Sequence, residues 1–351
     1  MSCYHPLYAI NYGIKENGKI KLIFCKNEND KIKAEQSGTL VKVPCGKCIG
    51  CNLDKSSNKA DQIMLEAKYY KNNCVVHLTY DDEHLPKNKG VDLKTGEIIE
   101  SETLQPKDVQ DFLKRLRKTY VKGRYQGKNF TKQIGIRTAY CGEYGEQKGR
   151  PHYHMILFNF KPHDIRYWSK SKSNYNTYKS DIMTKLWGKG IVDVNDLSRE
   201  MAEYIGRYVT KKWKGSTAKE TYEIVGKVPE FYHCSNRPGL GYKFFQEKKN
   251  TIYATDEIFI TSLKGTRTKK PPKYFDKLLE REDPPTLEEI KARRKERAKE
   301  RMDTMLAQTG ITEEEYQIRQ EEARYEKVKA LKRKNEAKKI EIDVFGRRKY
   351  T

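Results

Sequence analysis

A short segment with two histidines, GRPHYHMILFNF at residues 149–160, places the strongest constraint on the fold of this chain. Its run of aromatic and apolar residues predicts a strand, in which alternate side chains share a face. His152 and His154 therefore point to one side and Tyr153 to the other. This strand either carries two histidines by accident or forms half of a metal site built into a sheet.

Strand and helix signals along the chain alternate in a way that favours an α+β fold, with helices packed on an antiparallel sheet. IGIRTAYCGEYG at 134–145 predicts a second strand, joined to 151–160 in a hairpin by the polar residues EQKGR. Further strands are expected at 73–80 and 190–197, and helices at 105–122, about 176–187 and 198–215, the last with Ser198 as N-cap and Gly215 at its end. A charged helical tail is expected to follow.

The histidine pair could bind one metal ion, because two imidazoles two residues apart on one strand face can reach the same cation. A third ligand is available from Glu143 on the neighbouring strand or from Glu146 in the turn. Such a site would leave positions open for water or phosphate. Imidazole favours zinc and later transition metals, whereas a carboxylate in a phosphate-handling site suits Mg²⁺ or Mn²⁺.

Two tyrosines follow in the helix expected at 198–215. Tyr204, Tyr208 and Lys211 fall within one narrow sector, at the edge of the apolar stripe. Tyrosines at this spacing usually pack against a core. Next to a bound cation, however, a phenol becomes able to attack a DNA phosphodiester, leaving a phosphotyrosine and a free 3′ hydroxyl. One tyrosine suffices for a nick, and two suggest alternating nicking and joining.

Three cysteines at two-residue gaps, Cys45, Cys48 and Cys51, lie in PCGKCIGC. Such spacing suits tetrahedral Zn²⁺, and an iron–sulfur cluster could use it too. The alternative is free or redox-labile thiols. Candidates for a fourth ligand are Cys3, His5, Cys25 and Cys74. A zinc ion here would hold the N-terminal segment rather than take part in chemistry.

The charge of the chain points to a polyanionic partner. There are 71 lysines and arginines and a net charge of +23, which exceeds what solubility requires. RYWSKSKSNYNTYKS at 166–180 mixes aromatic and basic residues in an expected loop, as single-stranded DNA sites do. No apolar run approaches the ~20 residues of a membrane span, and the first residues do not have the pattern of a signal peptide. We therefore expect a cytoplasmic protein without a membrane partner.

Composition predicts three parts. Residues 1–70 are expected to be irregular around the cysteines, residues 71–250 to form the sheet domain, and residues 251–351 to be basic, highly charged, and helical or partly disordered. In the last part, solvated helix and a DNA-gripping arm are compatible interpretations.

The motifs taken together resemble the HUH endonucleases that start rolling-circle replication. VVHLTY, CGEYGEQKGRPHYHMILF and YIGRYVTKK are similar, in this order, to three motifs of the replication initiators of microviruses, especially gokushoviruses. The similarity also extends to PCGKCIGC and SNRPGLGYKFF, so that it covers roughly residues 1–250.

This resemblance implies a ferredoxin-like or RRM-like antiparallel sheet with helices on one face. It implies Mg²⁺ or Mn²⁺ at His152 and His154, with Glu143 preferred to Glu146 as third ligand. Tyr204 and Tyr208 would be the nucleophiles, with Lys211 assisting. The neighbouring Arg207 and Lys212 are expected to contact DNA.

The expected function is an endonuclease that nicks one strand at the phage origin, in single-stranded or supercoiled DNA, and later joins the ends in the bacterial host cytoplasm. The chain has no GxxxxGK[ST] sequence, so unwinding and synthesis would need a host helicase and polymerase. The alternatives are an HUH transposase or relaxase and a noncatalytic basic DNA-binding or packaging protein.

Overall fold

The computed structural model describes residues 3–14, 20–92, 94–121, 124–125, 128–129, 135–145, 149–170, 175–207, 218–262 and 265–326. The chain divides into two compact units. The first comprises Met1–Asp54 with Lys291–Thr351, and the second comprises Lys55–Ile290.

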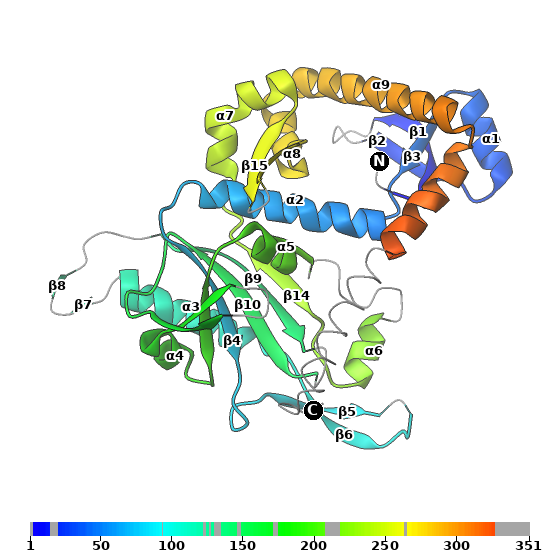
Figure 1. Ribbon diagram of the computed structural model, residues 1–351. Helices are drawn as coiled ribbons and strands as arrows, with labels where there is room; N and C mark the ends of the chain where they lie inside the picture. The colour runs from blue at the N-terminus through cyan, green and yellow to red at the C-terminus, as the bar shows by residue number, and fades with distance from the viewer. Residues whose placement is uncertain are drawn as a thin grey trace. The chain divides into compact units, whose positions relative to one another are not determined.

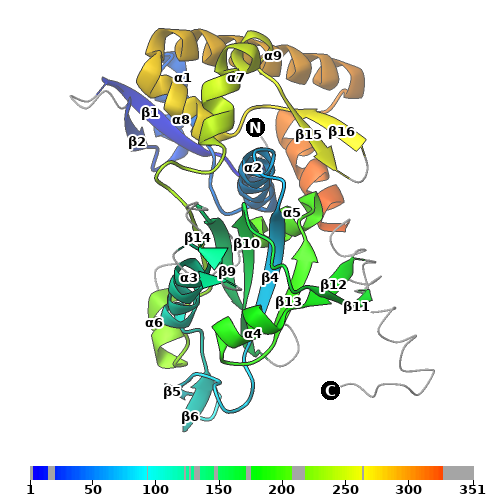
Figure 2. The same cartoon turned by 90° about the vertical axis from the view of Figure 1, so that its left-hand side faces the viewer.

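The second unit is built on a seven-stranded sheet in which every neighbouring pair is antiparallel. The strand order is β11-β12-β13-β4-β10-β9-β14, which can be followed across Figure 2. The strands are β4 (Asn73–Thr79), β9 (Arg137–Tyr144), β10 (Pro151–Phe158), β11 (Arg166–Lys170), β12 (Asn176–Lys179), β13 (Val192–Asp196) and β14 (Phe231–Cys234).

Helices cover both faces of this sheet (Figure 1). On one face, α3 (Pro106–Val121) and α4 (Asp181–Trp187) share a core with residues of β4, β10 and β13. On the other, α2 (Ile49–Ala67) and α5 (Arg199–Arg207) pack on β4, β9 and β10. We name these the α3 face and the α5 face. The helices expected on one face are therefore only half of the arrangement, because β10 is apolar on both sides.

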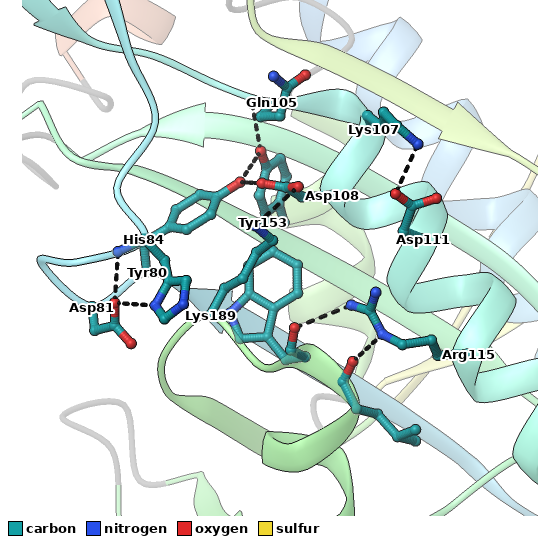
Figure 3. Close-up of polar contacts among 12 residues, drawn as sticks. Tyr80, Asp81, His84, Gln105, Lys107, Asp108, Asp111, Arg115, Tyr153 and Lys189 are labelled. Atoms are coloured by element: carbon teal, nitrogen blue, oxygen red, sulfur yellow. Dashed lines mark hydrogen bonds and ion pairs between the residues drawn. The ribbon is translucent and has the colours of Figure 1, made fainter.

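A hydrogen-bonded tyrosine pair fixes α3 to its face (Figure 3). The Tyr153 hydroxyl lies 2.9 Å from that of Tyr80 and accepts a 2.8 Å hydrogen bond from the backbone N–H of Gln105. Tyr80 in turn donates to Asp108 in the first turn of α3, and Lys189 lies 3.4 Å from the same carboxylate. Burial raises the pKa of both tyrosines, so both hydroxyls stay protonated.

Smaller elements complete the second unit. A third core joins α7, α8 and β15 with the start of α9. The elements are the hairpins β5 (Lys87–Val91)–β6 (Ile98–Glu102), β7 (Arg124–Tyr125)–β8 (Lys128–Asn129) and β15 (Ile258–Ser262)–β16 (Gly265–Lys269), and the helices α6 (Ala218–Ile224), α7 (Tyr242–Thr255) and α8 (Lys273–Glu282).

The first unit contains a three-stranded antiparallel sheet in the order β2-β1-β3. Asn27 caps α1 by accepting a hydrogen bond from the Asp30 N–H. The elements are β1 (Leu7–Ile14), β2 (Ile20–Phe24), α1 (Glu28–Gln36) and β3 (Leu40–Val43), with most of α9 (Pro284–Thr309) and a further helical stretch at 313–326.

The predicted α+β fold with an antiparallel sheet, packed helices and a helical C-terminal part is confirmed. Three local predictions were wrong. The first 70 residues are not irregular, because they contain three strands, α1 and the 19-residue α2. Residues 166–180 form strands β11 and β12 around undescribed residues, not a loop. The helix expected from 176 begins only at Asp181, because residues 176–179 pair with β13.

No helix among the described residues combines the length and the apolar composition that crossing a bilayer would require.

Candidate active site

The two histidines and one glutamate converge on the α5 face. His152 on β10 lies directly opposite Glu143 on β9, and His154 is on the same face two residues further along. The Glu143 Oε1 atom lies 2.8 Å from Nε2 of His152 and 2.5 Å from Nε2 of His154. Strand pairing alone thus brings a carboxylate and two imidazoles together, as alternation along the two strands requires.

Glu143 is almost fully buried, with 3% of its surface exposed. Burial on its own would raise its pKa, but the hydrogen bonds with His152 and His154 lower the pKa of Glu143 to about 2. The carboxylate is therefore ionised at neutral pH. It is an anionic ligand in a poorly solvated position.

Tyr204 reaches the same carboxylate oxygen from α5. Its hydroxyl donates a 2.8 Å hydrogen bond to Glu143 Oε1, and its ring lies 4.9 Å from that of His154 between centroids. The helix begins as predicted, because the Ser198 hydroxyl accepts a hydrogen bond from the Met201 N–H. One turn later, the half-buried Tyr204 lies at the edge of the apolar stripe, with its hydroxyl directed at the candidate metal site.

Buried contacts fix α5 against α2. Arg199, 7% exposed, forms an ion pair with Asp61 on α2 and a 3.0 Å ion pair with Glu203. Lys269 on β16 adds a 2.7 Å ion pair to the same aspartate. Further along α5, a Cβ at Gly206 would lie 2.8 Å from the Ser56 carbonyl oxygen, so only glycine allows this backbone approach.

The three ligands fit a divalent cation. One carboxylate oxygen of Glu143 and one nitrogen each of His152 and His154 lie within 4.8 Å of one another. Two imidazoles and one carboxylate, with coordination positions left over, match the ligand set of a catalytic metal site. The group could therefore bind a metal ion, whose identity the ligand types alone do not fix.

A third histidine adjoins this group and was not singled out as a site residue. His77 on β4 lies opposite His154, with ring centroids 4.3 Å apart, and its Nε2 has no hydrogen-bond partner in the described part of the chain. Burial, together with the neighbouring histidines, lowers its pKa well below the usual value, so the ring is neutral. The signal was present in VVHLTY, since strand alternation places His77 and Thr79 on one face.

Several predicted site residues lie outside the described residues. These are Tyr208, Lys211, Lys212, the turn residue Glu146 and the expected helix end at Gly215. Arg207, predicted to contact DNA, is the last described residue of α5 and is exposed.

The first unit holds a second candidate metal site. The sulfur atoms of Cys3, Cys45, Cys48 and Cys51 lie within 4.8 Å of one another, and all eight cysteines of the chain are free. The Cys3 and Cys48 sulfurs are 4.0 Å apart, close to the ~3.8 Å that Zn–S bonds of ~2.3 Å give in a tetrahedron.

Backbone N–H groups point at these sulfurs. Those of Cys48 and Cys51 lie 3.3 and 3.4 Å from the sulfurs of Cys45 and Cys48. Such donors favour thiolates, and four of them could bind a metal ion. Of the four candidates for a fourth ligand, Cys3 is the one that joins this cluster.

Comparison with known proteins gives a consistent set of relatives. The model of the replication-associated protein ORF2 family matches residues 73–213. The chain is 33% identical to the replication-associated protein ORF2 of Spiroplasma virus 4, over 85% of this chain and 87% of that protein. It is 26% identical to the replication-associated protein VP4 of Bdellovibrio phage phiMH2K, over 79% and 76% of the two chains. Identity is 34% to the replication-associated protein ORF4 of Chlamydia phage 1, over 49% of this chain and 38% of that protein. No solved structure matches the chain.

Proposed function

The chain belongs to the replication-associated protein ORF2 family, and from this premise we propose that it starts rolling-circle replication by nicking phage DNA with a tyrosine. The observation that carries the proposal is the convergence on Glu143 Oε1, which His152, His154 and the Tyr204 hydroxyl all contact. A phenol directed at a three-ligand cation site is the arrangement that tyrosine attack on a phosphodiester needs.

In the proposed reaction, Tyr204 supplies the attacking oxygen. The bond from its phenolic oxygen to phosphorus forms while the bond from phosphorus to the 3′ oxygen breaks, and one proton passes in net terms from the phenol to the 3′ oxygen. The products are a 5′-phosphotyrosine and a free 3′ hydroxyl. Glu143 orients the phenol through the hydrogen bond that it accepts from it. Mg²⁺ or Mn²⁺, held by Glu143, His152 and His154, would supply polarisation of the phosphate.

Joining uses a second nucleophile in this proposal. Tyr208 attacks the regenerated origin, and the freed 3′ hydroxyl then displaces Tyr204 from the first phosphotyrosine, which closes a single-stranded circle. Each exchange breaks one P–O bond and forms one, so no energy source is consumed. Lys211 is assigned to offset charge at the phosphate, and Arg207 and Lys212 to contact DNA. A host helicase and polymerase supply unwinding and synthesis.

The α5 face also offers a path for single-stranded DNA toward the sheet edge. Asp193 on β13 lies opposite His77 and forms a 2.6 Å ion pair with Lys179 on β12. The Lys179 ammonium lies 5.7 Å from the ring centroid of Trp168, which is 66% exposed. Trp168 is four strand spacings from β10, roughly 19 Å at ~4.8 Å each. An exposed indole beside cations is a stacking platform for bases.

A covalent adduct tests the nicking reaction. The full chain is incubated with circular single-stranded phage DNA and Mn²⁺, denatured in SDS, and examined for protein that stays attached to DNA. We expect an adduct that is lost when both Tyr204 and Tyr208 are replaced by Phe. An adduct that persists in this double variant contradicts the mechanism, and gel retardation without any cleavage favours the noncatalytic DNA-binding alternative. A transposase or relaxase would form the adduct too but would not release closed circles.

We further propose that the cysteine cluster holds structural Zn²⁺. The four sulfurs have the number and spacing of a closed tetrahedral site, which leaves no position for substrate. Metal analysis of the purified chain should give about one zinc per molecule, and Cys48→Ser should lower this content and the melting temperature together. A zinc content that is unchanged in Cys48→Ser, or a visible absorption typical of iron–sulfur clusters, would contradict the assignment.

A further inference from the structure

A lysine-lined pocket in the second unit belongs to none of the predicted sites. It has a volume of about 290 Å³ and is formed by α2, the segment 234–240 and α8. Four lysines line it, two from α2 (Lys55 and Lys59) and two from α8 (Lys273 and Lys277). These segments are far apart in the sequence, so no local motif announces the pocket.

The chemistry of the pocket selects an anion. None of the described residues that line it is an aspartate or glutamate. The first turn of α8 adds the positive end of a helix dipole, and Pro272 before it offers no side-chain cap. Among the other lining residues, Asn236 offers hydrogen bonds and Leu240 and Tyr274 offer an apolar surface. Such a combination suits a phosphate with an attached base.

Hydrogen bonds hold the walls of the pocket together. The Lys273 N–H donates to Asn58 Oδ1 at 3.0 Å, which joins α8 to α2. The Gly239 N–H donates to the Tyr274 hydroxyl at 3.0 Å, which joins the segment 234–240 to α8. The lysines therefore project from a preformed frame rather than from a surface that would have to assemble around a ligand.

The pocket adjoins the α5 face next to the candidate nick site. The Lys59 ammonium lies 5.7 Å from the ring centroid of Tyr232 on β14. Tyr232 lies opposite Cys141 on β9, which in turn lies opposite His154 on β10. Two strand spacings, roughly 10 Å at ~4.8 Å each, thus separate Tyr232 from His154.

The geometry points to a binding site for a backbone phosphate of the DNA strand, at the β14 side of the nick site. This inference rests on the proposed function, since it assumes that a strand crosses the α5 face. The strand would run from the exposed Trp168 at one sheet edge, past Tyr204, to the four lysines at the other. The pocket would then determine how firmly the strand is held and leave the chemistry at Glu143 unchanged.

A matched pair of double variants tests the pocket. Lys273→Ala with Lys277→Ala removes two exposed lysines four residues apart on α8. Lys114→Ala with Lys118→Ala removes the same charge at the same spacing from α3, on the opposite sheet face. Binding of fluorescein-labelled dT20 is measured by anisotropy at several salt concentrations. The full chain, with Mn²⁺ present, carries Tyr204→Phe and Tyr208→Phe so that no strand is cut.

We expect the α8 pair to weaken dT20 binding on the order of tenfold and to reduce the slope of log affinity against log salt by about 1.4, or ~0.7 for each lost contact. The α3 pair should change both much less, and Lys273→Arg with Lys277→Arg should restore binding. Equal effects of the two alanine pairs would overturn the proposal. So would displacement of dT20 by dTMP or inorganic phosphate at equal concentration, because the pocket would then bind a free phosphate compound.

The outcome is separate from that of the adduct test. If the unmodified chain forms no covalent adduct, the proposed nicking activity fails, yet the comparison of the α8 and α3 pairs still decides whether the pocket binds DNA. If the adduct forms and the two pairs bind alike, only the pocket assignment fails.

Discussion

The two faces of β10 carry side chains of opposite use, although they alternate along eight residues. On the α5 face, His152 and His154 converge on one carboxylate and leave room for a cation. On the α3 face, Tyr153 and Met155 are fully buried in an extended core, and the one hydroxyl there is satisfied by Tyr80 and Gln105. Polar groups on the first face are left for an incoming ligand, whereas those on the second are used within the fold.

This difference teaches that one strand can be rigid because of one face and reactive because of the other. The α3 face anchors β10 through its packed core, so that ligand positions on the α5 face need not be maintained by the ligand itself. Variants on the two faces should therefore separate activity from stability, and each prediction below tests that separation.

The largest effect is expected from His154→Ala. Loss of a ligand removes several kcal/mol of transition-state stabilisation, so adduct formation should fall on the order of a thousandfold. The free energy of unfolding should change little, because the side chain contacts Glu143 and neighbouring rings rather than the α3-face core. Single-turnover nicking and urea unfolding measure the two quantities.

Met155→Ala is the matched control, one residue further along and on the opposite face. It should cost about 2–5 kcal/mol of stability, as truncations of buried methionines do, and leave the nicking rate of the remaining folded protein near that of the unmodified chain. The comparison breaks if Met155→Ala abolishes nicking at temperatures where the protein is folded, or if His154→Ala unfolds it.

An intermediate effect is expected from Trp168→Ala. Loss of one stacked base should weaken single-stranded DNA binding by about 1–3 kcal/mol. Tyr167→Ala is the control, because Tyr167 is similarly exposed at 61% but lies opposite Tyr178, which packs against the α3-face core. Anisotropy with dT20 compares the two variants. If Tyr167→Ala is as harmful as Trp168→Ala, DNA does not distinguish the faces of the sheet.

The smallest effect is expected from Tyr153→Phe. The ring remains in the core, but the Gln105 N–H loses its acceptor and Tyr80 loses a partner, which should cost about 1–2 kcal/mol. Nicking should be unchanged, since the hydroxyl is on the α3 face. Thermal unfolding and adduct yield are compared with those of the unmodified chain, and a loss of nicking without loss of stability would argue against the separation.

Elements with a strong local period were predictable. Helix α3 follows from the apolar spacing of residues such as Val109, Phe112 and Leu116, and the β9–β10 hairpin from its alternating residues and polar turn. Strand β12 was not, because its four residues, NTYK, are polar and become a strand only by pairing with β13. Helix α2 was missed since Ser56, Ser57 and Asn58 suggest coil, whereas tertiary packing of Ala60 and Ile63 holds it helical.

The candidate site was predictable where it depended on neighbouring strands. Alternation placed His152 and His154 together, and the hairpin register brought Glu143 opposite them. His77 was overlooked because it comes from β4, whose pairing with β10 spans 77 residues of sequence and leaves no local signal. The same reason hid the lysine pocket, whose walls come from α2, the segment 234–240 and α8.

The close approach of Gly206 to Ser56 bears on how two tyrosines could share one reaction centre. With its backbone in contact with α2 and Arg199 ion-paired to Asp61, α5 has no free space in which to roll or slide. On the proposed mechanism, successive cuts would then come from advance of the DNA strand past a stationary helix. The polynucleotide is the moving part, and the protein is a fixed frame that sets where along the strand each cut falls.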